Sequence, residues 1–221
     1  MKKKFIFLIF FLVLVLITAS FLIINRTEKE GSFIKNEEGS FYKEEGLEVL
    51  DIYFGNENNP TKVTFKVNNA GVSYNLPDEV NWFKNEKGNI EAKTGLETFR
   101  YSFIREKGKV IGIKAEMILK DSPKHNVYTF DMNLEGAKRE RNISSRDFYD
   151  KNNNLVFYME KPSMTDQKEN KSEDINLRIT NSQIALVPSK EWLGKEEREY
   201  PVVIDFSFKV ADSIIEEKTK D

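Results

Sequence analysis

The stretch REYPVVIDFSF (198–208) has a clear strand pattern. It lies near the end of a chain of 221 residues. Pro201 holds φ at about −65° and has no N–H to donate, so a strand can begin there but cannot run through it. Hydrophobic and polar residues alternate after it, and the hydrophobic ones are Val202, Ile204, Phe206, Phe208 and Val210. A period of two is typical of a strand with one buried face. We therefore expect a long closing strand.

Just before this strand, PSKEWLG (188–194) is a segment with the signals of a helical turn. Ser189 is expected to cap its start and Gly194 to end it. The turn would place Trp192 at the entrance of the closing strand.

The same alternation runs through the chain from Val49 onward. It is clearest in KVTFKVN (62–68), TFRYSF (98–103) and VYTFDMNL (127–134), and turn sequences such as DKNNN (150–154) separate the alternating runs. Many short strands joined by turns are typical of antiparallel sheets. The sequence therefore predicts an all-β fold, either an antiparallel sandwich or an open barrel.

The N-terminus has the pattern of an export signal. Three lysines precede an unbroken hydrophobic run from Phe5 to Ile24, and the chain becomes polar immediately afterwards. A run of about 20 residues, rising about 1.5 Å per residue, spans the roughly 30 Å hydrocarbon core of a membrane. We predict an N-terminal apolar helix in residues 1–24, either a cleaved signal peptide or a retained signal-anchor that contacts the membrane through residues 5–24. The remaining chain is then expected outside the cell, membrane-anchored or secreted.

These features divide the chain into four parts. After the signal, residues 25–48 are charged and contain glycines, so we expect a stalk or linker. Residues 49–210 are expected to form the β-domain, and residues 211–221 a charged tail. Without the three N-terminal lysines, 31 basic residues stand against 36 acidic ones, a net charge near −5. This balance argues against a nucleic-acid partner.

The absence of cysteine limits the chemistry that the chain can support. An exported domain of this size without disulfides fits a bacterium better than an animal secretory pathway. With His125 as its one histidine, the chain lacks the usual ligands of a zinc site. A Ser–His–Asp triad would need His125 with the nearby Ser122, but no strand–turn–helix serine motif is present. We therefore predict no catalytic residue, no cofactor and no enzymatic activity.

Calcium is the one metal for which the sequence offers a candidate. Asp150, Asn152 and Asn154 stand at the alternating positions of a calcium loop. Leu155 replaces the expected glycine and Lys161 the expected acidic residue, so the segment is not an EF-hand. The alternative is a hairpin turn rich in residues that tolerate positive φ.

Two aromatic residues, Trp82 and Phe83, sit beside polar turns. Aromatic rings at such places can stack on sugar rings, so we select this pair as candidate exposed ligand contacts. The alternative is that both belong to the core.

Several stretches, taken in order, resemble a known module. They are KVTFKVNNAGVSYNLP (62–77), KTGLETFRYSFIREKGKVIGIKAEMILKDSP (93–123), VYTFDMNLEG (127–136), DFYDKNNNLVFYMEKPSMTD (147–166) and SQIALVPSKEWLGKEEREYPVVID (182–205). The module is a β-rich one that precedes DNRLRE-type and RHS/YD-repeat regions in bacterial wall-associated surface proteins. Its signature residues here are Trp192, Tyr200, Pro201 and Asp205, and Phe206 replaces the proline that usually follows. The resemblance implies a structural or adhesive surface module without catalytic residues.

The sequence thus predicts an exported, non-enzymatic β-sheet module that acts in structure or interaction at the bacterial cell envelope. Its expected partner, besides the membrane, is a surface protein or polysaccharide. The alternative is a carbohydrate-active or other hydrolase domain on the same kind of β-scaffold. Such an enzyme would need two close carboxylates facing a cleft, and the sequence does not select them.

Overall fold

The computed structural model describes most of the chain beyond residue 39. The described residues are 40–45, 50–56, 58–77, 80–95, 97–140 and 145–218. The predicted apolar helix at 1–24 lies outside them, as does most of the predicted stalk. None of the described helices combines the length and the hydrophobicity that crossing a membrane requires.

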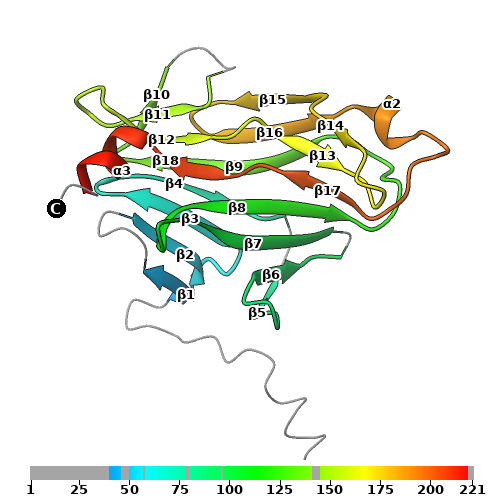
Figure 1. Ribbon diagram of the computed structural model, residues 1–221, viewed down its shortest axis with the longest axis horizontal. Helices are drawn as coiled ribbons and strands as arrows, with labels where there is room; N and C mark the ends of the chain where they lie inside the picture. Colours follow the sequence, from blue (N-terminus) through cyan, green and yellow to red (C-terminus); the bar gives the residue numbers. More distant parts are fainter. Residues whose placement is uncertain are drawn as a thin grey trace, which may run out of the picture. The chain divides into compact units, whose positions relative to one another are not determined.

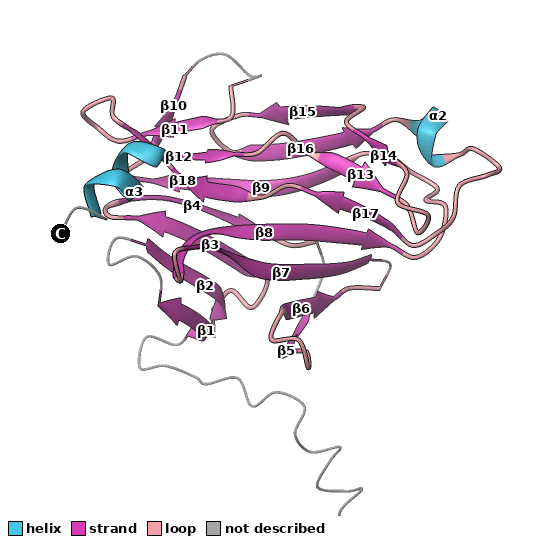
Figure 2. Ribbon diagram, in the orientation of Figure 1, coloured by secondary structure: helices cyan, strands magenta, loops and turns pink. Residues whose placement is uncertain are grey.

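Two antiparallel sheets pack face to face in the described domain (Figure 1 and Figure 2). The smaller sheet has seven described strands, in the spatial order β1 (Ser40–Glu45), β2 (Leu50–Asn56), β3 (Lys62–Val67), β4 (Ala70–Asn75), β9 (Tyr128–Glu135), β16 (Gln183–Pro188) and β15 (Ile175–Ile179). The larger sheet starts with β5 (Asn81–Lys84), β6 (Ile90–Lys93), β7 (Glu97–Glu106) and β8 (Lys109–Leu119). Both β17 (Val202–Asp205) and β18 (Phe208–Val210) pair with β8. From β17 the sheet continues through β13 (Ser163–Thr165) to β14 (Lys171–Ser172). From β18 it continues through β12 (Leu155–Met159) and β11 (Asp147–Tyr149) to β10 (Lys138–Arg139).

Of the two architectures that the alternating pattern predicts, the structure has two packed antiparallel sheets in a mostly β fold, and across the described residues neither sheet closes into a barrel. The predicted helical turn is α2 (Lys190–Leu193), in which the Ser189 side chain accepts the Trp192 N–H and Gly194 ends the turn. Strand β1 lies within the stretch assigned to the stalk, and α3 (Asp212–Lys218) lies within the expected tail. The division into domains stays a prediction.

The closing strand occupies the middle of the larger sheet, in two pieces. Both β17 and β18 pair with β8, through Val202 opposite Leu119 and Phe208 opposite Ile113. Between them, the Phe206 N–H still donates to a β8 carbonyl at 2.9 Å. On its other edge the strand pairs with β13 and β12. The predicted inward face is fully buried, which confirms the alternation.

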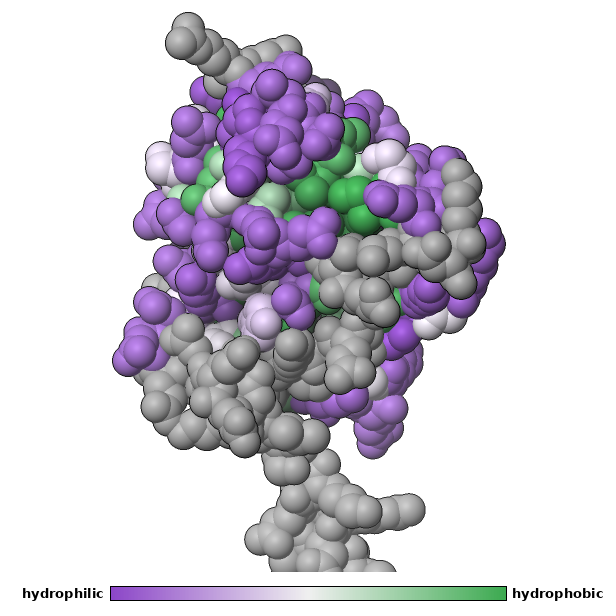
Figure 3. Space-filling model, turned by 90° about the vertical axis from the view of Figure 1, so that its left-hand side faces the viewer, coloured by the Kyte–Doolittle hydropathy of each residue, from purple (hydrophilic) through white to green (hydrophobic). Residues whose placement is uncertain are grey.

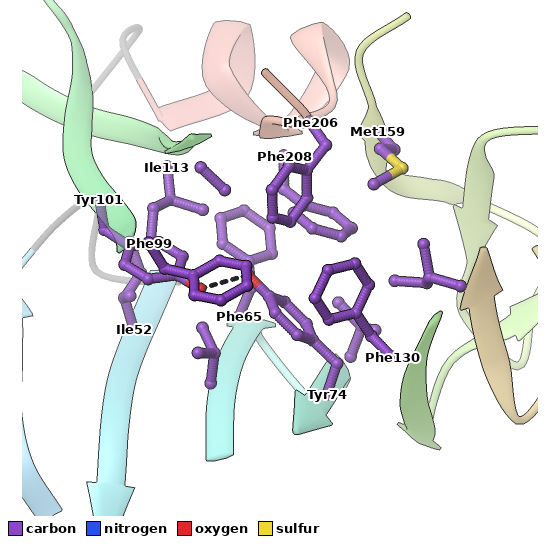
Figure 4. Packing of buried hydrophobic residues seen from close by; sticks show 14 of the residues in the cluster. Ile52, Phe65, Tyr74, Phe99, Tyr101, Ile113, Phe130, Met159, Phe206 and Phe208 are labelled. Atoms are coloured by element: carbon purple, nitrogen blue, oxygen red, sulfur yellow. Dashed lines mark hydrogen bonds between the residues drawn. The ribbon is translucent and has the colours of Figure 1, made fainter. Parts of the chain in front are cut away.

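Aromatic side chains from both sheets fill the space between them (Figure 4). Phe65 of the smaller sheet packs against Phe208 of the larger one, with ring centroids 5.9 Å apart. The hydroxyl of Tyr74 donates to that of Tyr101 across the sandwich at 3.3 Å, so neither polar tip is left without a partner. Burial contributes about 1.5–3 kcal/mol for each large apolar side chain, so this layer explains why the alternating sequence folds.

Three hairpin turns share one sequence pattern and one geometry: NEKGN (85–89), DKNNN (150–154) and DQKEN (166–170). In each, the first residue's N–H donates to the fifth residue's carbonyl, and the first side chain accepts the fifth N–H. The fourth residues have positive φ, at 81° for Gly88, 68° for Asn153 and 65° for Glu169. An Asp or Asn followed four positions later by Asn therefore marks these turns.

Candidate functional site

A buried ion pair joins the loop before the closing strand to the β13–β14 hairpin. We call Asp166, Asn170, Trp192, Arg198 and Tyr200 the Asp166 cluster. Arg198 Nη1 lies 2.5 Å from Asp166 Oδ2, and the exposed fractions of the two side chains are 4% and 0%. The guanidinium carbon lies 3.5 Å from the centroid of the Trp192 ring, and Arg198 Nε donates to the Trp192 carbonyl at 3.1 Å. The Tyr200 hydroxyl donates to a carbonyl of α2 at 2.9 Å.

The charge of Asp166 is held inside this cluster. Burial raises the pKa of Asp166, but hydrogen bonds from the Asn170 side chain and backbone, together with the Arg198 guanidinium, lower it overall to about 2. The carboxylate is thus ionised at neutral pH and surrounded by donors. It is placed to fix the loop rather than to exchange a proton.

Sequence reasoning found only part of this cluster. It named Trp192, Tyr200 and Pro201, which the structure places together in the loop, where the Tyr200–Pro201 peptide is cis. It missed Asp166 and Arg198 as partners, although both lie within the stretches that carry the resemblance. The turn pattern DQKEN could have pointed to Asp166, but nothing local shows that this turn is buried.

The fourth signature residue, Asp205, lies apart from the cluster, in a row of alternating charges across the outer face of the larger sheet. We call Glu91, Arg100, Lys114, Glu116 and Asp205 the outer charge network. Lys114 Nζ lies 3.5 Å from Asp205 Oδ2 and 2.5 Å from Glu116 Oε1. Arg100 Nη1 lies 3.7 Å from Glu116 Oε2, and its Nε 3.0 Å from Glu91 Oε1. Such cross-strand pairs stabilise the alignment of neighbouring strands.

The calcium candidates form the hairpin turn between β11 and β12. Asp150 Oδ1 accepts the backbone N–H groups of Asn152 and Asn154 at 2.8 and 2.9 Å, and its Oδ2 accepts the Asn154 side-chain amide at 3.0 Å. Both carboxylate oxygens are therefore used within the turn. Among the described residues, no group of three or more His, Cys, Asp or Glu side chains could hold a metal.

The exposed position predicted for Trp82 is wrong. Trp82 is 8% exposed, and its ring packs between Phe54 and Tyr101 in the core. Its Nε1 donates to the Pro60 carbonyl at 2.6 Å, which satisfies the indole N–H. The reason is strand alternation, because Trp82 occupies the inward face of β5. Phe83 faces the other way and is half-buried, with Lys93 Nζ 4.6 Å from its ring centroid, and its ligand contact stays a prediction.

The histidine is not part of a triad in the described structure. His125 and Ser122 line one cavity of about 400 Å³ with Glu97 and Lys120. No hydrogen bond joins His125 to Ser122 among the described contacts, and the histidine ring instead lies beside Tyr128 at 5.5 Å. The cavity is open to solvent.

A second polar cavity opens in the outer face of the smaller sheet, and we call it the β4–β9 crevice. The pairing of β4 with β9 ends at Tyr74 opposite Met132, whereas β9 extends back to Tyr128 along β16. A crevice of about 250 Å³ results where the two strands part. Its lining residues are Asn59, Lys62, Ser73, Tyr74, Asn75, Asp131, Met132 and Asn133.

Hydrophobic surface is visible at one end of the molecule. Figure 3 views the end near α3 and shows hydrophobic side chains gathered in one area, with hydrophilic side chains around it. Partly buried Ile214 belongs to this end of the core.

Comparison with known proteins shows a distant, partial relationship. The chain is 29% identical over 104 residues to the tRNA(Glu)-specific nuclease WapA of Bacillus subtilis subsp. natto and to the tRNA nuclease WapA of Bacillus subtilis strain 168. The tRNA3(Ser)-specific nuclease WapA of Bacillus spizizenii matches over the same length. Each match includes 42% of this chain and only 4% of the relative. No family model and no solved structure matches the chain. The chain thus contains a mostly β domain and is distantly similar to a small part of these large proteins.

Proposed function

We propose that this chain is a non-enzymatic β-sandwich module that acts in structure or interaction at the bacterial cell envelope, on the outside of the cell. The export pattern of residues 1–24, the sandwich and the partial similarity to WapA support this role. The nuclease activity in the relatives' names belongs to proteins of which this chain matches 4%, so it does not enter the proposal.

The observation that carries the proposal is the pairing of four buried or partly buried carboxylates in the described structure. Glu91, Glu116 and Asp205 each lie within 4 Å of a cation in the outer charge network, and Asp166 is bound by Arg198. Groups held in this way stabilise strands and loops. A glycoside hydrolase would instead use two carboxylates free to face a substrate. The β4–β9 crevice has one, Asp131. The cavity beside His125 has Asp121 and Glu97, but Glu97 Oε2 accepts the Thr94 hydroxyl.

The proposal is tested by adding trypsin to intact cells that express the full-length chain. An envelope module is digested, or is recovered in the medium, while a cytoplasmic marker protein stays intact. If the chain is cut only after the cells are lysed, the extracellular role is wrong. Quantitative immunoblotting with antibodies against the β-domain gives the readout.

A further inference from the structure

The outer faces of the two sheets use their polar side chains differently. On the larger sheet, the outer charge network pairs each charged group with another. In the β4–β9 crevice, by contrast, five side chains make no hydrogen bond or ion pair with another described residue. They are Lys62, Ser73, Asn75, Asp131 and Asn133. Unused donors and acceptors that converge on one cavity are typical of a binding site.

Ser73 lies at the base of the crevice. The residue is 8% exposed, and its hydroxyl makes no hydrogen bond with another described residue. Its oxygen is not one of the fully enclosed polar atoms that lack a partner, so solvent or a ligand in the crevice can reach it. Ser73 lies opposite Asn133 in the β4–β9 register, so its hydroxyl opens into the crevice.

The crevice is built from backbone that is already rigid. Ser73 and Asn75 belong to β4, and Asp131 and Asn133 to β9. Each strand is paired on its far side, β4 with β3 and β9 with β16. A backbone held by paired strands needs little ordering when a ligand binds, which favours affinity.

The chemistry of the lining selects the class of ligand. One ammonium, from Lys62, and one carboxylate, from Asp131, balance each other, so neither an anion nor a cation is strongly attracted. A single carboxylate beside an ammonium is also a poor calcium site. The amides of Asn75 and Asn133 each present a donor and an acceptor, which is the pairing that a sugar hydroxyl or an acetamido group needs.

The size of the crevice fits one sugar unit. Its volume of about 250 Å³ is below that of pockets for drug-sized ligands, about 300–1,000 Å³. Further units of a glycan would lie on the sheet surface. Tyr53 stands in the same cross-strand row as Ser73, two strands away and therefore at about 10 Å, where an aromatic ring could stack on a neighbouring sugar.

We propose that the β4–β9 crevice binds one unit of a neutral, hydroxyl-rich glycan. This inference rests on the proposed envelope function and names the class of partner. Asn75, Asn133 and Asp131 hydrogen-bond the sugar from the two walls, and Ser73 binds it from the floor.

The test is isothermal titration calorimetry of the full-length chain in detergent micelles. The probes are the β-1,4-linked tetramer of N-acetylglucosamine and cellotetraose. At least one tetramer binds, and Asn75→Ala and Asn133→Ala each weaken its binding by about tenfold, the effect of one lost hydrogen bond at a sugar. The matched control is Asn176→Ala, which removes an exposed asparagine of the same sheet outside the crevice and leaves the affinity unchanged. Circular dichroism melting confirms that all three variants fold.

The outcomes separate this inference from the proposed function. No heat with either tetramer up to about 10 mM overturns the glycan site, because binding weaker than that is negligible. Binding that the two crevice variants leave unchanged also overturns it, by placing the glycan elsewhere on the chain. In both cases the proposed envelope function is still supported if trypsin digests the chain on intact cells. If calorimetry with calcium chloride shows binding that Asn75→Ala and Asn133→Ala abolish, the crevice binds a cation and the glycan proposal is wrong.

Discussion

At the scale of single residues, Asp166 shows how one turn sequence serves two purposes. The turns that begin at Asn85, Asp150 and Asp166 have the same internal hydrogen bonds. Only the third is buried against Arg198, and its carboxylate fixes the loop that carries Trp192. Turn chemistry is local, so the sequence can predict it. The partner lies 32 positions away, and no local pattern gives it.

Replacing Asp166 by Asn tests the value of this pair. Asn keeps the turn, as Asn85 does, but leaves the charge of Arg198 buried without a counter-ion, which costs about 3–5 kcal/mol at pH 7. The matched control is Asp150→Asn, in an exposed turn of the same geometry, and its effect should be much smaller because the charge is exposed to solvent. Urea unfolding followed by circular dichroism measures both. Equal effects of the two substitutions would mean that the buried pair contributes nothing beyond the turn.

The ionisation of Asp166 also makes the folding stability sensitive to acid. Because the pKa of Asp166 is about 2 in the folded chain and about 3.9 in an unfolded one, its contribution to stability is complete above about pH 5. That contribution is lost as the pH falls through 4 to 2, by about 2 kcal/mol. In Asp166→Asn this part of the pH dependence should disappear. If Asp166→Asn loses stability with falling pH as steeply as the parent, the acid sensitivity comes from other carboxylates.

At the scale of elements, the alternating pattern predicts which face of the closing strand is buried but not where the strand lies in the sheet. The alternation of hydrophobic residues gives the buried face, since that requires only a period of two. The interruption after Asp205 and the central place of β17 and β18 depend on β8, β12 and β13, which come from distant parts of the chain. The same limit explains the error at Trp82. Its neighbouring turns are polar, but its position in β5 faces the core.

Gly112 lies opposite Lys209 where β8 pairs with β18. A Cβ at this position would lie 2.4 Å from the Phe208 carbonyl oxygen, so Gly112→Ala must push the two strands apart. We expect a loss of about 1–3 kcal/mol, as for other overpacked sites. Gly95→Ala is the control, because a Cβ there meets no atom within 4 Å. Thermal unfolding distinguishes the two, and a Gly112→Ala protein as stable as Gly95→Ala would contradict the described pairing.

At the scale of the whole molecule, the sandwich could be predicted and the candidate site could not. Alternating strands and turn signals suffice for two packed antiparallel sheets. The β4–β9 crevice exists because β4 ends at Asn75 while β9 begins at Tyr128 on the neighbouring strand line. Where two strands stop pairing is decided by the arrangement of the sheet, not by the residues near either end. In the sequence, polar residues such as Asn133 therefore cannot be distinguished from those of an ordinary solvent-exposed face.

The proposed function requires that the chain binds at the envelope and catalyses no reaction there. The most direct measurement is co-sedimentation of the full-length chain, in detergent, with purified protein-free cell walls of its own bacterium, together with an assay for released reducing sugar. We expect saturable binding to the wall pellet and no release of sugar. A chain that stays in the supernatant at every wall concentration, or one that releases reducing sugar, would contradict it.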